Sequence, residues 1–113
     1  MTQYIIYFNQ QWVGEHSPES IAERGRRAHD VVEEMKRAGV YVVAGGVDEN
    51  LDNAFSADDT GGTLVITDGP YPAQDARLGG LTIVDVADDT AAKLWAGKLA
   101  EACGWPQEVR RIF

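Results

Sequence analysis

Residues 3–8 read QYIIYF, a run of β-branched and aromatic side chains that is typical of a β-strand. Successive side chains of a strand point to opposite faces of the sheet. Tyr4 and Ile6 therefore share one face, and Ile5 and Tyr7 share the other. Residues 63–67 (TLVIT) and 81–87 (LTIVDVA) also carry apolar side chains on both faces. A sheet built from such strands needs an apolar cover on each side.

A first helix is predicted between the strand over residues 3–8 and a second strand over residues 40–47 (VYVVAGGV). Ser17 can cap the helix, Pro18 suits its first position, and Gly39 can end it after Ala38. Its expected apolar stripe is Ile21, Gly25, Ala28, Val32 and Met35. A glycine inside a helix costs about 1 kcal/mol relative to alanine, so Gly25 predicts a close approach of this helix to the sheet.

A second helix is predicted over residues 90–102, with Asp88 or Asp89 as its cap and Gly104 as its end. Its expected core stripe is Ala91, Leu94, Trp95, Leu99 and Ala102. Trp105 is expected to pack against the end of this helix. A short strand follows over residues 108–113.

The order of elements predicts the fold. Residues 53–57 and the turn over 58–62 form an inserted hairpin arm before a third main strand over residues 63–67. The whole reads as an α+β domain over residues 1–113, a ferredoxin-like sandwich of βαββαβ order with an inserted hairpin. Two helices cover one face of the sheet only, and a bare second face would expose several hundred Å² of apolar surface. We therefore expect a homodimer packed sheet against sheet.

Composition excludes several classes of function. The net charge is −8, from 18 acidic and 10 basic residues, so nucleic acid is disfavoured as a partner. Cys103 is the single cysteine, and no apolar run approaches the length of a membrane span, so we expect a cytoplasmic protein without a membrane partner. His16 and His29 lack the spacing of a metal site, and no cofactor motif is present. We expect neither a metal nor a cofactor.

Two segments resemble a known family. Residues 67–71 (TDGPY) and 78–80 (LGG) match, in type and spacing, the signature of the YCII-related family in its branch with a D-G-P-F motif, with Tyr71 in place of phenylalanine. Residues 28–46 (AHDVVEEMKRAGVYVVAGG) resemble the helix and strand in which that family carries a histidine. One departure is the connector over residues 73–76 (AQDA), where this branch usually has acids and where Asp75 is not at a usual acidic position.

The resemblance implies a ferredoxin-like subunit that forms a dimeric α+β barrel. It also implies a pocket with a catalytic histidine and aspartate, which fall on His29 and Asp68 of this chain. Some relatives catalyse eliminations or isomerisations of small ring compounds. Genes of the D-G-P-F branch often lie beside alternative sigma factors, which implies a role in regulation or stress.

The residues allow this chemistry and also a plainer interpretation. A carboxylate beside an imidazole fixes its tautomer and raises its pKa, which makes a general base near neutral pH. Otherwise His29 is a helix-edge residue with one hydrogen bond. Asp68 can instead form an Asx turn, with Gly69 extended before Pro70. A substrate pocket lined by Tyr7, Trp12 and Tyr71 is expected, although core packing or dimer contact would explain the same aromatic residues.

Two functions remain open from the sequence. The first is a cofactor-free enzyme, of lyase or isomerase type, that uses His29 and Asp68 for general acid–base chemistry on a small molecule. The alternative is a non-catalytic module that binds a small molecule or a protein in transcriptional or stress regulation. Hydrogen-bond reach between His29 and Asp68 beside an open cavity would favour the enzyme.

Overall fold

The computed structural model describes residues 1–71 and 76–113. Over these ranges the chain is a mixed α+β fold with two α-helices and two antiparallel sheets. The elements are, in order, β1 (Thr2–Asn9), the 3-10 turn η1 (Gln10–Trp12), α1 (Pro18–Arg37), β2 (Tyr41–Gly46), the 3-10 turn η2 (Leu51–Asn53), β3 (Phe55–Asp58), β4 (Val65–Asp68), β5 (Leu78–Val86), α2 (Asp89–Cys103) and β6 (Glu108–Arg111).

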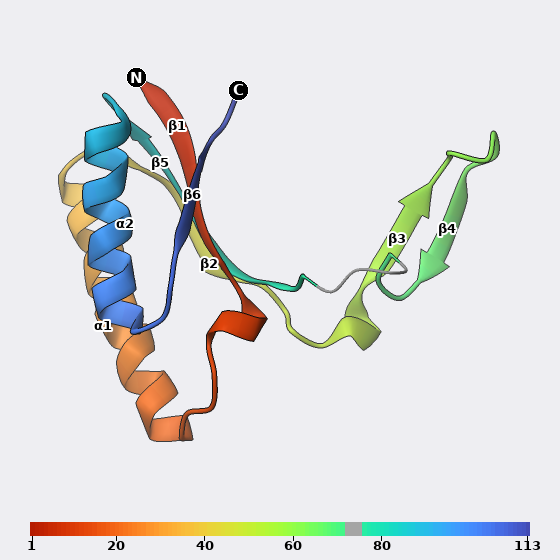
Figure 1. The fold of residues 1–113 in the computed structure, drawn as a ribbon, viewed down its shortest axis with the longest axis horizontal. Helices are drawn as coiled ribbons and strands as arrows, with labels where there is room; N and C mark the ends of the chain where they lie inside the picture. Colours follow the sequence, from red (N-terminus) through yellow and green to blue (C-terminus); the bar gives the residue numbers. More distant parts are fainter. Residues whose placement is uncertain (72–75) are drawn as a thin grey trace.

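The main sheet has four strands in the order β2-β5-β1-β6. Each neighbouring pair is antiparallel, with Tyr4 opposite Val84 in the centre. Both helices lie on the same side of this sheet (Figure 1). The α+β class predicted from the sequence is confirmed, and the arrangement is compatible with a ferredoxin-like layout.

The ends of the helices are set by local hydrogen bonds. The Ser17 hydroxyl accepts a bond from the Ser20 amide at 3.1 Å, and Pro18 occupies the first turn of α1. The Asp88 carboxylate accepts a bond from the Ala91 amide at 2.9 Å. Gly104 ends α2 with a φ of +84°, a conformation that glycine adopts without strain. The caps predicted from the sequence are confirmed.

The core lies between the main sheet and the helices. Tyr4 and Ile6 of β1 and Val84 and Val86 of β5 are buried on the helix side, together with Met35 of α1. On the other side, the alternate residues Ile5, Tyr7, Leu81 and Ile83 are half-buried, and neither of the two described α-helices covers them. The predicted division of β1 and β5 into two apolar faces is therefore confirmed.

The prediction of a third main strand over residues 63–67 was wrong. β4 leaves the main sheet and pairs with β3 alone, with Ile66 opposite Ala57. β5 has β1 on one edge and β2 on the other, so β4 cannot pair with β5, the strand that follows it in sequence. This hairpin, the β3–β4 arm, extends away from the helices (Figure 1). Its side chains Phe55, Leu64, Val65 and Ile66 are more than half exposed.

Both helix stripes differ in part from the prediction. In α2, Leu94 is exposed, and the buried residues are Ala92, Ala96, Leu99, Ala102 and Cys103, because small side chains let the helix lie close to the sheet. In α1, a Cβ added at Gly25 would meet nothing within 4 Å, so the close approach expected there does not occur. The first half of α1 stands away from the sheet. Within the described ranges, neither helix combines the length and the apolar character needed to cross a membrane.

Candidate functional site

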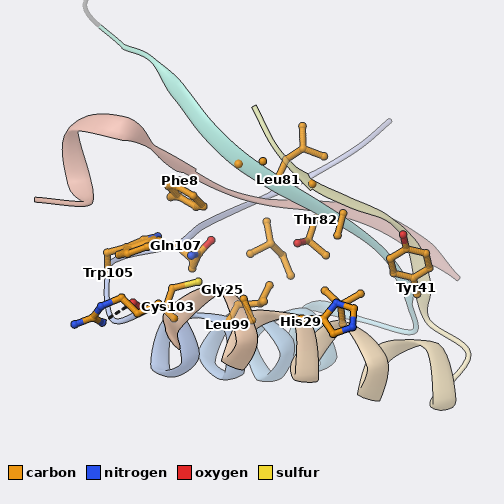
Figure 2. Close-up of a pocket in the computed structure, with 18 of the residues that line it drawn as sticks. Phe8, Gly25, His29, Tyr41, Leu81, Thr82, Leu99, Cys103, Trp105 and Gln107 are labelled. Carbon is orange, nitrogen blue, oxygen red and sulfur yellow. Dashed lines mark hydrogen bonds between the residues drawn. The ribbon is translucent and has the colours of Figure 1, made fainter. Parts of the chain in front are cut away.

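A cleft with a volume of about 650 Å³ lies between α1 and the helix-facing side of the main sheet (Figure 2). We call it the α1 cleft. The apolar stripe of α1 forms one wall, from Ile21 through Gly25 and Ala28 to Val32. Ile6, Phe8 and Thr82 line the sheet side, and Leu99, Cys103, Trp105 and Gln107 close the end beside α2. The residues that sequence periodicity assigned to the core thus line a cavity.

Glycines on both sides shape the α1 cleft. On the sheet side, a Cβ at Gly79 would come within 2.5 Å of the Phe8 ring, and a Cβ at Gly80 within 2.7 Å. This glycine pair therefore allows the Phe8 ring to lie against β5 at the roof of the cleft. On the helix side, Gly25 leaves open space where any other residue would place a side chain.

His29 lies on the α1 wall of the cleft, where the structure pairs it with its own helix. Its Nε2 atom is 3.5 Å from Oε1 of Glu33, one turn further along α1. The side chain of His29 is 69% exposed, so this contact contributes little to stability. The pair can still bias the orientation of the imidazole ring. Sequence reasoning missed Glu33, although the spacing of four residues on a helix is a signal that could have identified it.

Asp68 lies elsewhere, at the end of β4 on the arm, and α1 lies at the opposite side of the molecule (Figure 1). Within one chain the structure does not bring Asp68 and His29 together. The turn after Asp68 is held by other groups, since the Gly69 amide donates to the Ala54 carbonyl at 2.7 Å and the Ser56 hydroxyl donates to the Gly69 carbonyl at 2.8 Å. Gly69 has a φ of +101°, so the extended conformation expected before Pro70 was wrong, and glycine is required there.

The three predicted aromatic residues are divided between two places. The rings of Tyr7 and Trp12 contact each other, with centroids 6.1 Å apart, and Tyr7 belongs to the sheet face opposite the α1 cleft. Tyr71 is half exposed at the end of the described arm. The connector residues 73–75 lie outside the described residues. Only Tyr7 and Trp12 are brought together, and none of these three residues lines the cleft.

Trp105 and Gln107 were missed as site residues. The Trp105 ring contacts the rings of Phe8 and His16, with centroids 5.3 and 5.8 Å away. Nε1 of Trp105 and Nε2 of Gln107 are buried and have no hydrogen-bond partner among the described residues. The sequence signal is slight, because a tryptophan after a helix-ending glycine is equally typical of a packed cap. Trp105 therefore lines the cleft as well as packing at the end of α2.

The electrostatic character of the α1 cleft differs from that of the whole chain. Arg24, His29 and Lys36 line it, and no aspartate or glutamate is among its described lining residues. Lys36 forms an ion pair with Glu33 at 3.2 Å. Burial raises the pKa of the Cys103 thiol, so this residue stays protonated near neutral pH and is not poised as a nucleophile.

No family model and no curated protein sequence matches this chain. Among residues 1–71 and 76–113, no group of histidine, cysteine, aspartate and glutamate side chains is arranged to hold a metal ion.

Proposed function

We propose that this protein binds a small, mainly apolar molecule in the α1 cleft and moves a proton to or from it through His29, in a reaction of the elimination or isomerisation type. The observation that carries the proposal is the cleft itself, about 650 Å³ of apolar-walled space with an imidazole on one wall. Small-molecule sites are commonly clefts of roughly 300–1,000 Å³ with few polar groups.

The chemistry needs only the residues of this chain. Nε2 of His29 lies 3.5 Å from Oε1 of Glu33, so the carboxylate favours the neutral tautomer that keeps its proton on Nε2, and Nδ1 is then free to take a proton from the ligand. The carbon–hydrogen bond of the ligand would break as the Nδ1–hydrogen bond forms. The imidazolium would then return the proton to a different atom of the ligand, or to a leaving group. This is general base and then general acid catalysis by one residue, and it requires no cofactor.

We propose further that the protein is a homodimer, a dimeric α+β barrel of ferredoxin-like subunits. The sheet face without a helix carries Ile5, Tyr7 and Ile83, which suits a sheet-against-sheet contact. The β3–β4 arm adds exposed apolar side chains and projects from the body of the subunit. The arm is thus the element that can carry Asp68 to a second copy, where it could orient the partner's His29. The free Cys103 suits the reducing cytoplasm.

The alternative is a non-catalytic small-molecule or protein-binding module in transcriptional or stress regulation. The observation that favours it is the position of His29, whose side chain is 69% exposed and which does not meet Asp68 within one chain. Under this alternative the α1 cleft is a ligand site without chemistry.

The experiment begins with a thermal-shift screen of small aromatic compounds and lactones against the wild-type protein. Compounds that bind are then incubated in D₂O, and deuterium uptake into the ligand is followed by NMR for wild type, His29→Gln and Glu33→Gln. We expect His29→Gln to bind but to lose about 100-fold or more of the exchange rate. We expect Glu33→Gln to lose less. Ligands that bind without any exchange dependent on His29 would establish the binding module instead, and a cleft that binds nothing would refute both functions.

A further inference from the structure

The end of the α1 cleft beside α2 contains two hydrogen-bond donors for which the described part of the chain offers no acceptor. Trp105 Nε1 and Gln107 Nε2 lie two residues apart on the segment between α2 and β6, and both atoms are buried. Figure 2 shows Trp105 and Gln107 together at one end of the cleft, with the Phe8 ring beside them. A buried donor without a partner costs about 1–3 kcal/mol, so this end of the cleft favours a ligand that brings an acceptor.

Arg24 places a positive charge at the same end. Its Nη1 donates to the Cys103 carbonyl at 2.6 Å, and its Nε donates to the Ser20 hydroxyl at 3.1 Å. The Arg24 guanidinium carbon lies 6.0 Å from the centre of the Trp105 ring. Gly104 makes this position possible, because a Cβ there would collide with the guanidinium group.

The positive charge of Arg24 has no carboxylate partner within residues 1–71 and 76–113. Among the described residues no carboxylate forms an ion pair with Arg24, although the chain has 18 acids and only 10 bases. None of the described residues that line the cleft is acidic. In a chain of net charge −8, a cleft whose described lining holds no acid and a guanidinium group without a described carboxylate partner is suited to an anion.

We propose that the α1 cleft is specific for a small organic carboxylate, a flat apolar body whose carboxylate lies between Arg24, Trp105 and Gln107. The two carboxylate oxygens accept hydrogen bonds from Trp105 Nε1 and Gln107 Nε2, and the Arg24 guanidinium balances their charge. The apolar body extends between the α1 stripe and the sheet toward His29, which Figure 2 shows at the other end of the cleft. This inference rests on the proposed function of the cleft as a small-molecule site.

Two probes of nearly equal shape test the inference. Naphthalene-2-carboxylate offers two anionic acceptors, whereas naphthalene-2-carboxamide offers one neutral acceptor on the same apolar body. Their dissociation constants are measured by calorimetry with the wild-type protein. We expect the carboxylate to bind at least about tenfold more tightly, because hydrogen bonds to charged groups are stronger than neutral ones.

Variants at the donors locate the carboxylate. Trp105→Phe removes the Nε1 donor and keeps an aromatic ring, and Gln107→Glu places a negative charge where the amide lies. We expect the preference for carboxylate over carboxamide to fall about fivefold in the first and to vanish or reverse in the second. Ala22→Glu adds the same charge at an exposed position of α1 that does not line the cleft, and should leave the preference unchanged. Thermal unfolding checks that each variant is folded.

The outcomes separate this inference from the proposed function. If both probes bind with equal affinity, the inference is overturned and the small-molecule site stands. If the preference exists but survives both Trp105→Phe and Gln107→Glu, the carboxylate lies elsewhere and the assignment of these donors is wrong. If neither probe binds, the inference fails, and the wider library described above then decides the proposed function separately.

Discussion

Replacement of Gly25 by leucine should fill the α1 cleft while strengthening the helix that carries it. Gly25 lies in α1 at the cleft wall, and a Cβ at this position meets no atom within 4 Å. Gly97 in α2 is a matched control, because it is also a helical glycine with open space around its Cβ but does not line the cleft. Gly25→Leu and Gly97→Leu should therefore raise helix stability equally, and only Gly25→Leu should reduce the volume of the cleft.

The two effects have different signs and sizes. A helical glycine is about 1 kcal/mol less favourable than the best helix formers, so each variant should be more stable by roughly 0.5–1 kcal/mol. For a domain of this length that gain corresponds to a rise in melting temperature of about 2–4 °C. In the cleft, the leucine side chain takes space that the ligand needs, and overpacking costs roughly 1–3 kcal/mol. That cost weakens ligand binding about 5- to 150-fold.

Calorimetry with naphthalene-2-carboxylate, or with any compound that the screen identifies, measures the binding effect, and thermal unfolding measures the helix effect. We expect both variants to melt higher than wild type and only Gly25→Leu to lose affinity. Equal affinities for Gly25→Leu and wild type would show that the cleft is not the binding site. Equal losses in Gly25→Leu and Gly97→Leu would show that the loss does not come from the cavity.

Three further predictions concern the groups that hold the site and the subunits. Gly104→Ala should lower the free energy of unfolding by more than the roughly 1–2 kcal/mol that a positive φ alone costs, because the new Cβ collides with Arg24. Gly39→Ala is the control, since Gly39 also has a positive φ (+73°) but has open space around its Cβ. If both variants lose the same free energy of unfolding in urea, this role of Arg24 is contradicted. If the protein forms the proposed homodimer, Ile83→Lys should convert it to monomers in sedimentation equilibrium, whereas Leu94→Lys on the exposed side of α2 should not. A wild-type protein that is a monomer would refute the proposed dimer. The Asp89 carboxylate accepts a hydrogen bond from the Tyr4 hydroxyl at 2.5 Å and forms an ion pair with Arg111 at 3.3 Å. Both interactions lower the pKa of Asp89. The wild-type protein should therefore be more stable than Asp89→Asn by its full margin at pH values above about 3.9, the pKa of an aspartate in the unfolded chain. This margin should shrink as the pH falls through the lower pKa of Asp89 in the folded protein. A margin that does not change with pH would contradict the prediction.

The candidate site was predictable only in part. His29 was expected as a site residue because the family resemblance places a histidine at this position of the helix, and the structure puts it on the cleft wall. Its partner was not found correctly, since the family resemblance pointed to Asp68 and the structure gives Glu33. Trp105 and Gln107 could not be found, because whether their donors meet an acceptor depends on elements distant in sequence.

The sequence by itself determined the boundaries of the helices and the two faces of the strands. Ser17, Asp88 and Gly104 act through hydrogen bonds and backbone angles that involve residues only a few positions away. Alternation along β1 and β5 likewise follows from the geometry of a single strand. Such signals are complete within a short segment, so a single sequence is enough to read them.

Only the tertiary structure decided that the first half of α1 stands away from the sheet and that β4 leaves it. The α1 cleft is bordered by Arg24, which donates to the carbonyl of Cys103, 79 residues further along the chain, and by the Phe8 ring, which lies on Gly79 and Gly80. β4 pairs with β3 and not with β5, both of whose edges are occupied by β1 and β2. The position of α1 and the pairing of β4 depend on which distant segments pack against the sheet, and a local pattern of residues does not contain that information.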